Sequence, residues 1–121
     1  MPENVSINQD LGIIEVNSYG KVTGKTLDAS LKEVINLEKE TGINRILVDT
    51  TQQTEMPSVM TLYNFANELP RNIRFAIVVS EGQDTKEDQD FFETVARNRG
   101  FSVREFTNRT DAIHWLGTGK V

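Results

Sequence analysis

The segment from Ile43 to Asp49 constrains the fold of this chain more than any other part of the sequence. It reads Ile-Asn-Arg-Ile-Leu-Val-Asp and leads into a polar run from Thr50 to Gln53. An apolar run that ends in a carboxylate and a polar turn predicts a buried parallel strand over residues 43–48. Open α/β sheets place their sites at the carboxyl ends of such strands, so we expect any functional site to lie near Asp49.

Size and composition predict one domain. The chain has 121 residues, enough to bury a core without a metal or a disulfide. The absence of cysteine excludes thiol nucleophiles, thiolate metal sites and disulfides, and it favours a cytoplasmic location. No apolar stretch approaches the roughly 20 residues of a membrane-spanning helix, and the N-terminus lacks the pattern of a signal peptide. We expect one domain over residues 1–121, ordered over about 4–117, with a disordered tail from Thr118.

The charge balance argues against a nucleic-acid partner. The net charge is −5, whereas sequence-independent nucleic-acid binding relies on an excess of Lys and Arg. Arg97, Arg99 and Arg104 lie close together, but the first two fall near a predicted helix C-terminus, where cations oppose the helix dipole. The aromatic residues of a single-strand-binding platform are missing around them. We therefore expect no nucleic-acid binding.

Hydrophobic periodicity predicts the element order β, β, α, β, α, β, α, β, α. Alternating or continuous apolar residues favour strands, and apolar residues three and four positions apart favour helices. Helices between strands need right-handed crossovers, so this order gives an α/β fold with a mixed, mainly parallel sheet of about five strands, four helices and an N-terminal antiparallel hairpin. The expected strands cover residues 5–8, 13–19, 43–48, 75–79 and 101–106, and the expected helix caps are Thr26, Ser58 and either Thr107 or Asn108.

The second expected helix, from Ser58 to Pro70, carries more apolar side chains than one buried face needs. Met60 and Phe65 lie off that face, and Met56 precedes it. Adaptable methionine and aromatic side chains suit a partner surface or a pocket for an apolar ligand. The extra apolar residues are explained equally well if this helix simply buries a wide face in the core beneath a long loop. The expected buried face consists of Val59, Leu62, Tyr63, Ala66 and Leu69.

Two segments carry a resemblance to a known family. Arg45 to Asp49 supplies its central strand, and Asp111 to Leu116 contains Ala-Ile-His-Trp-Leu, which is similar to the terminal Ala-x-x-Trp-Leu of that family. In these segments and in element order, from about Ile13 to Leu116, the chain resembles the SpoIIAA-like group of the STAS superfamily of anti-sigma-factor antagonists. The resemblance implies a mixed sheet covered by helices and a non-enzymatic regulatory or ligand-sensing role.

The same resemblance directs attention to the residues after the central strand. In the antagonists, a serine that follows the strand's Asp, at the start of the next helix and before a Gly, is phosphorylated by a partner kinase. Here Thr50 and Thr51 follow Asp49, so the Asp-Ser-x-Gly pattern is absent. Ser58 is the nearest physical equivalent and a candidate phosphorylation site, where phosphate would meet the positive end of a helix. A helix cap is its alternative role.

Few other residues suggest chemistry. Asp49, Thr50 and Thr51 could bind a polar ligand or a phosphate with help from backbone donors at the following helix, or Asp49 could accept hydrogen bonds from its own turn. Asp49 is not expected to accept a phosphoryl group as the aspartate of a receiver domain does, because the acidic residues that would hold Mg²⁺ and the lysine after the last strand are missing. His114 is the only histidine, which excludes His-pair metal sites. We expect it on the surface of the last helix beside Trp115, a cover for the core, and we expect no metal and no cofactor.

We therefore expect a non-catalytic domain that binds a ligand, a protein partner or a second copy of itself through the strand end at Asp49 and the following helix. One alternative is a carrier of an apolar, lipid-like ligand. Another is a small hydrolase or transferase that uses Asp49 with a threonine hydroxyl. The candidate ligand- or partner-binding residues are Asp49, Thr50, Thr51, Met56, Ser58, Met60, Tyr63 and Phe65.

Overall fold

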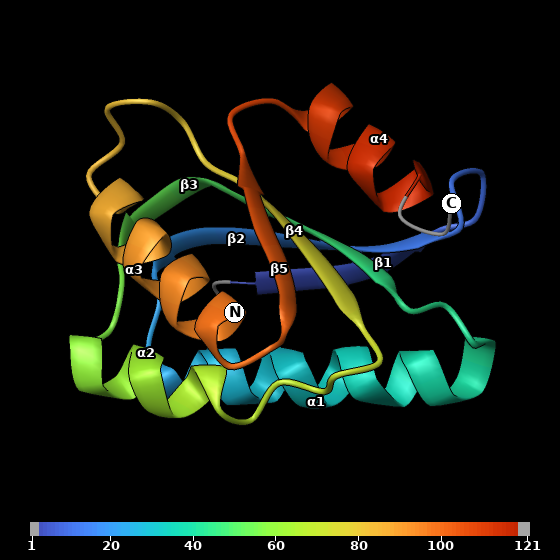
Figure 1. Ribbon diagram of the computed structural model, residues 1–121, viewed down its shortest axis with the longest axis horizontal. Helices are drawn as coiled ribbons and strands as arrows, with labels where there is room; N and C mark the ends of the chain where they lie inside the picture. Colours follow the sequence, from blue (N-terminus) through green and yellow to red (C-terminus); the bar gives the residue numbers. More distant parts are fainter. Residues whose placement is uncertain (1–2, 119–121) are drawn as a thin grey trace.

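A five-stranded sheet with the strand order β1-β2-β3-β4-β5 forms the centre of the molecule (Figure 1). This computed structural model describes residues 3–118. The first two strands pair in antiparallel fashion and the others in parallel, which confirms the mixed, mainly parallel α/β sheet with an N-terminal hairpin. The strands are β1 (Glu3–Asn8), β2 (Ile13–Lys21), β3 (Arg45–Glu55), β4 (Arg74–Val78) and β5 (Ser102–Phe106), and the helices are α1 (Gly24–Thr41), α2 (Val59–Ala66), α3 (Lys86–Asn98) and α4 (Arg109–Thr118).

The helices cover the two faces of the sheet unequally. In Figure 1, α1 and α2 lie below the strands and α4 lies above them. Right-handed crossovers between consecutive neighbouring strands bring α1, α2 and α3 to one face, where the larger core forms. The opposite face is covered by α4 and buries a smaller cluster, which consists of Ile13, Leu47, Ala76, Val78, Ala112 and Leu116.

The central strand is longer than the sequence pattern predicts. We expected it to end at Val48, but β3 continues to Glu55. Its polar half pairs with the end of β2, where Tyr19 lies opposite Gln52, and the register shifts in this region. Threonine is β-branched and favours strands, and the long β2 supplies a hydrogen-bonding partner. Asp49 therefore lies within the strand and not at its end.

The first helix begins three residues earlier than expected. Thr23, not Thr26, is its N-cap: the Thr23 hydroxyl accepts a hydrogen bond from the backbone N–H of Thr26 at 3.2 Å, and the Thr26 hydroxyl accepts one from the backbone N–H of Thr23 at 3.0 Å. This reciprocal arrangement is a capping box in which threonine replaces the usual Glu or Gln. The helix ends, as predicted, at Gly42, whose φ of 77° is in the left-handed region that glycine adopts without strain.

The second helix is short and is rotated relative to our expectation. Ser58 is its N-cap, as predicted, and accepts a hydrogen bond from the backbone N–H of Thr61 at 3.3 Å. Leu62, Ala66 and Leu69 are buried as predicted, but Val59 and Tyr63 are 56% and 39% exposed. The buried face is turned toward Phe65, which is partly buried against the core, and this rotation leaves Val59 and Tyr63 on the solvent side.

The last two helices follow the sequence expectations closely. Phe92 and Ala96 of α3 are buried, and α3 has acidic residues in its first turn and Arg97 in its last. Asn108 caps α4, since its Oδ1 accepts a hydrogen bond from the backbone N–H of Asp111 at 2.8 Å. Thr118 belongs to α4, which corrects our assignment of this residue to the tail, and residues 119–121 lie outside the described residues.

Within residues 3–118, no helix has the length and apolar character needed to cross a membrane.

Candidate functional site

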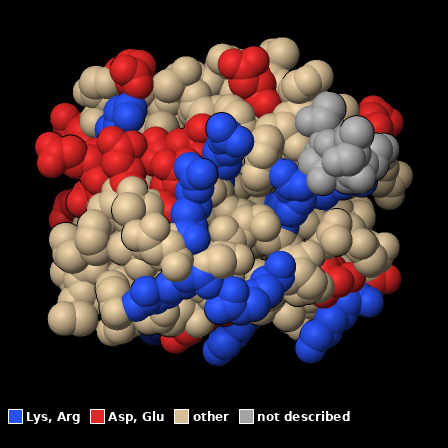
Figure 2. All heavy atoms as spheres, in the orientation of Figure 1, with Lys and Arg blue, Asp and Glu red and all other residues tan. Residues whose placement is uncertain are grey.

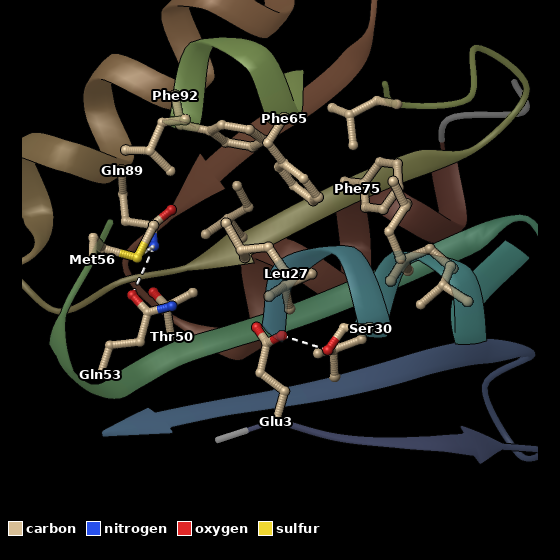
Figure 3. A pocket seen from close by; sticks show the side chains of 18 residues that line it. Glu3, Leu27, Ser30, Thr50, Gln53, Met56, Phe65, Phe75, Gln89 and Phe92 are labelled. Carbon is tan, nitrogen blue, oxygen red and sulfur yellow. Dashed lines mark hydrogen bonds between the residues drawn. The ribbon is translucent and has the colours of Figure 1, made fainter. Parts of the chain in front are cut away.

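A cavity of about 80 Å³ lies between the sheet and the three helices α1, α2 and α3 (Figure 3). Its walls come from four strands and three helices, and most of the side chains that line it are aliphatic or aromatic. Figure 3 shows Phe65 and Phe92 at the top of the view, and their ring centroids are 5.8 Å apart. The cavity is thus an apolar space inside the larger core.

Strand alternation and helical spacing explain why these side chains meet. Side chains two positions apart point to the same face of a strand, so Val48 and Thr50 of β3 both line the cavity. On α1, positions three and four apart share a face, which brings Leu27, Ser30 and Leu31 to the opposite wall. The same rules place Asp49, between Val48 and Thr50, on the α4 side of the sheet.

A buried carboxyl group forms part of the cavity wall. Glu3, at the start of β1, is 9% exposed, and the Ser30 hydroxyl donates a hydrogen bond to its Oε1. Burial raises the pKa of Glu3, because the charged form loses hydration, and hydrogen bonds with Ser30 and Ser18 act in the opposite direction. Figure 3 shows Glu3 and Ser30 together at the bottom of the view. This end of the cavity can therefore recognise a polar group.

A chain of buried amides leads toward the same carboxyl group. The Gln89 side-chain amide donates to Gln53 Oε1 at 2.8 Å, and Gln53 Nε2 donates to the Ser18 hydroxyl at 2.8 Å. Ser18 lies opposite Glu3 in the β1–β2 ladder and is a hydrogen-bond partner of its carboxyl group. Donors thus follow one another from α3 across β3 and β2 to β1, and Glu3 is the final acceptor. Such a connected polar network fixes the side chains that belong to it.

A surface groove of about 120 Å³ lies next to the cavity, between α1 and α2. The helices approach closely at Gly24, where a Cβ atom would lie 2.8 Å from Cγ2 of Thr61. Phe65 lines both the groove and the cavity, so its side chain separates them. Asp28 and Glu68 also line the groove. A ligand in the cavity would reach solvent on this side by displacing Phe65.

The structure separates the candidate residues at the central strand. Asp49 Oδ1 accepts hydrogen bonds from the Thr51 backbone N–H at 2.9 Å and from the Thr51 hydroxyl at 2.6 Å. This is the alternative in which Asp49 satisfies its own local backbone. Thr50 is buried, lines the cavity and donates to the Val78 carbonyl at 2.7 Å. Asp49 and Thr50 thus face opposite sides of the sheet.

The candidates on and before α2 are divided in the same way. Met56 and Phe65 line the cavity together with Thr50. Met60 is 67% exposed, and Ser58 and Tyr63 are also at the surface. The Arg99 guanidinium lies over the Tyr63 ring, 4.5 Å from its centroid, and donates a hydrogen bond to the Tyr63 hydroxyl. Three of the eight predicted residues therefore meet in the cavity.

Sequence reasoning missed the four polar residues that line or approach the cavity with Thr50. Glu3 precedes the strand that we expected to begin at Val5, and Gln53 falls in the expected loop. Ser30 and Gln89 occupy core-facing positions of α1 and α3, next to Leu31 and three residues before Phe92. Polar residues on otherwise apolar helical stripes were the available signal.

Charged side chains outside the cavity are segregated along α3. Figure 2 shows acidic side chains gathered over the beginning of α3, while basic side chains lie below, near its end. At the acidic end, Glu105 of β5 lies between α3 carboxylates with its Oε2 buried and without a hydrogen-bond donor. Burial and the neighbouring Asp90 raise the pKa of Glu105 to about 8. At the basic end, Arg97 lies in the last turn of α3 and Arg99 is its C-cap residue, the positions at which cations oppose the helix dipole.

Trp115 and His114 on α4 take the places expected of them. Trp115 is partly buried against the smaller core cluster, with its ring 5.7 Å from that of Phe106 and 4.1 Å from the Arg74 guanidinium. His114 is exposed. The start of the same helix is tied to β2, because Arg109 donates two hydrogen bonds to Glu15, at 2.8 and 2.7 Å. These contacts hold α4 against the face of the sheet opposite the cavity.

Comparison with known proteins identifies the fold. No family model and no curated protein matches the sequence. Among solved structures, the chain is similar to an uncharacterised protein of the DUF3478 family from Shewanella loihica PV-4, described as having a SpoIIAA-like fold. The TM-score is 0.61 at 19% sequence identity, over 94% of this chain and 91% of that one. This likeness confirms the fold implied by the sequence resemblance: the chain is an α/β domain with the SpoIIAA-like fold.

Proposed function

We propose that this protein is a non-catalytic binding domain that holds a small, mostly apolar molecule in the cavity beneath α2. The observation that carries the proposal is a cavity of about 80 Å³ with apolar walls and a buried carboxyl group at one end. Ligand sites typically combine an apolar lining with a few polar groups that orient the ligand. Here Glu3 and Ser30 supply the polar contacts, and the aromatic side chains supply the apolar ones.

The lining supports binding better than catalysis. Among the described residues that line the cavity, Glu3 is the one side chain that ionises. General acid–base catalysis and activated nucleophiles usually need a second group with a matched pKa within hydrogen-bonding distance. The hydroxyl of Thr50 is already bonded to the Val78 carbonyl. The enzymatic alternative, which used Asp49 with Thr50 or Thr51, receives little support from this arrangement.

Butan-1-ol is a suitable probe for the cavity. We expect it to shift the backbone amide signals of Ser30, Gln53 and Phe65 in a saturable manner, because these residues surround the cavity. Two-dimensional NMR during a titration measures the effect. Leu31→Phe should abolish the shifts by filling the space, at a cost of about 1–3 kcal/mol in unfolding free energy. Ile113→Phe, on α4 and packed against the other face of the sheet, is the matched control and should leave binding unchanged. Linear, scattered shifts in the parent protein would contradict the proposal.

Self-association through α2 is a second candidate function. The observation that favours it is the exposure of Val59, Met60 and Tyr63, which are 56%, 67% and 39% accessible. The segment from Met56 to Asn67 contains no charged residue. Contiguous apolar surface of this kind is typical of interaction sites.

Met60→Asp tests this second function. We expect the substitution to leave the melting temperature nearly unchanged, because Met60 is exposed, and to abolish any dimer detected by sedimentation at increasing concentration. Asn36→Asp, at an exposed position on α1, adds the same charge elsewhere and should leave the dimer intact. A parent protein that remains monomeric at every concentration would exclude self-association.

A further inference from the structure

The charged side chains among the described residues that line the cavity and its neighbouring groove are all acidic. Glu3 is the one ionisable group among the 18 described residues that line the cavity. The groove on the other side of Phe65 is lined by two carboxylates, Asp28 and Glu68, and by no basic side chain among its described residues. A ligand with a carboxylate or phosphate would meet repulsion at the groove and an unfavourable neighbour inside. The electrostatics therefore favour a cationic ligand group.

The hydrogen bonds around Glu3 point to the same conclusion. The hydroxyl of Ser30 donates directly to the carboxyl group, and the donors of Gln89 and Gln53 lead to Ser18 on its other side. Donors arranged around a carboxyl group stabilise its ionised form. A buried carboxylate is costly without a positive partner, however, and none is present among the described lining residues. An ammonium group would supply the missing charge.

We propose that the cavity takes a short apolar amine, whose ammonium group binds the Glu3 carboxylate while its hydrocarbon part contacts Phe65, Phe75 and Phe92. This inference rests on the proposed function of the cavity and specifies its ligand. An ammonium group has three donors, and an ionised carboxylate that accepts from two hydroxyls still keeps acceptor positions free. The acidic groove raises the local concentration of cations next to Phe65.

The cavity volume limits the hydrocarbon part. An engineered apolar cavity of roughly 150 Å³ binds benzene, and the cavity here is about 80 Å³. Without movement of Phe65, the cavity therefore holds a ligand smaller than benzene. Butylamine is about as large as benzene, so its binding requires Phe65 to move toward the groove. Butan-1-ol and butyrate differ from butylamine essentially in the head group and share this requirement.

Titration of the three compounds tests the inference. At about pH 8 and low salt, we expect butylamine to bind about tenfold or more tightly than butan-1-ol, because its contact with Glu3 is charge-assisted. Butyrate should give no saturable shifts. The readout is the set of backbone amide signals of Ser30, Gln53 and Phe65. Glu3→Gln should remove the preference for the amine, while Glu33→Gln, at an exposed position on α1, should preserve it.

A second measurement uses pH and needs no variant. Butylamine stays protonated over the range from about pH 8 to about pH 4.5, whereas Glu3 becomes protonated as the pH falls. The amine affinity should therefore fall toward acidic pH, and the butan-1-ol affinity should stay nearly constant. The causes that shift the Glu3 pKa are burial, Ser30 and Ser18, and no charged side chain is among them.

The outcomes separate the two proposals. If none of the three compounds gives saturable shifts, cavity binding itself is wrong. If butan-1-ol or butyrate binds as tightly as butylamine, the cavity binds ligands but the amine inference is overturned. A preference for the amine that persists in Glu3→Gln, or an amine affinity that does not fall toward acidic pH, also overturns it.

Discussion

Replacing Phe92 by alanine is expected to lower the free energy of unfolding by about 3–5 kcal/mol, the usual cost of truncating a buried phenylalanine. Phe92 is buried in the larger core and lines the cavity beside Phe65, with the two ring centroids 5.8 Å apart. The surrounding side chains already border an empty space, so they have few contacts with which to close a larger one. Urea unfolding followed by circular dichroism measures the loss, and an unchanged m value would show that the unfolded state is unaffected.

The same variant links stability to the proposed function. Phe92→Ala enlarges the cavity, so benzene should now bind and raise the melting temperature. A ligand at about 100 times its Kd adds about 2.7 kcal/mol of stability. Val95→Ala, on the same helix but only partly buried, is the control and should show a smaller loss and no rescue by benzene. A loss below about 1 kcal/mol for Phe92→Ala would mean that this part of the core rearranges freely.

Replacing Glu105 by glutamine is expected to stabilise the protein by about 2 kcal/mol at pH 8 and to have little effect at pH 4; solvent screening of this partly buried group reduces the effect to about half of what the full pKa shift corresponds to. Burial, Asp90 and Glu93 raise the pKa of Glu105 from 4.5 to about 8, although the Lys86 ammonium group lies 4.0 Å from its Oε1. The folded protein thus retains a proton that the unfolded chain releases near pH 4.5. The contribution of Glu105 to the free energy of unfolding is therefore largest below pH 4.5, and it decreases as the pH rises to 8.

Glutamine has the shape of protonated glutamate and does not ionise. The free energy of unfolding should therefore decrease less with rising pH in the variant than in the parent protein. Its amide can also donate to Asp90, as protonated Glu105 would. Urea unfolding at several values between pH 4 and pH 8.5 gives the comparison. Glu87→Gln, at an exposed position in the first turn of α3, should change stability by less than about 0.5 kcal/mol at every pH. Parallel pH profiles for Glu105→Gln and the parent would contradict the assignment.

The sequence predicted the order and type of the elements because they depend on local periodicity. The β-branched run before Val79, the helical stripe of α1 and the alternation in β5 all correspond to elements in the structure. Helix ends were predicted correctly where one residue is clearly suited to cap the helix, as Ser58 is at the start of α2 and Gly42 at the end of α1. At Thr23 and Thr26, two threonines compete for one role, and their spacing alone does not decide between them.

The cavity could not be predicted from local patterns, because it depends on contacts between distant residues. Glu3 meets Ser30 across 27 positions and Gln53 meets Gln89 across 36. Each of these residues is polar and would be placed at the surface by composition alone. The extension of β3 beyond Asp49 depends on pairing with β2, which is also a long-range contact. Thr50, Met56 and Phe65 are the predicted candidates that line the cavity.

The sequential strand order determines where this fold has room for a small molecule. Doubly wound sheets bind their ligands at a topological switch point. There, the connections from two adjacent strands lead to opposite faces of the sheet, and a crevice opens between their loops. The three crossovers described here all turn the same way, so β3 and its neighbours have no such divergence at their carboxyl ends. The cavity described above lies instead between the sheet and the helices that cover it. Under the proposed function, substitutions that change the volume of the core would therefore alter the ligand preference of this chain more than changes in the loops at the edge of the sheet.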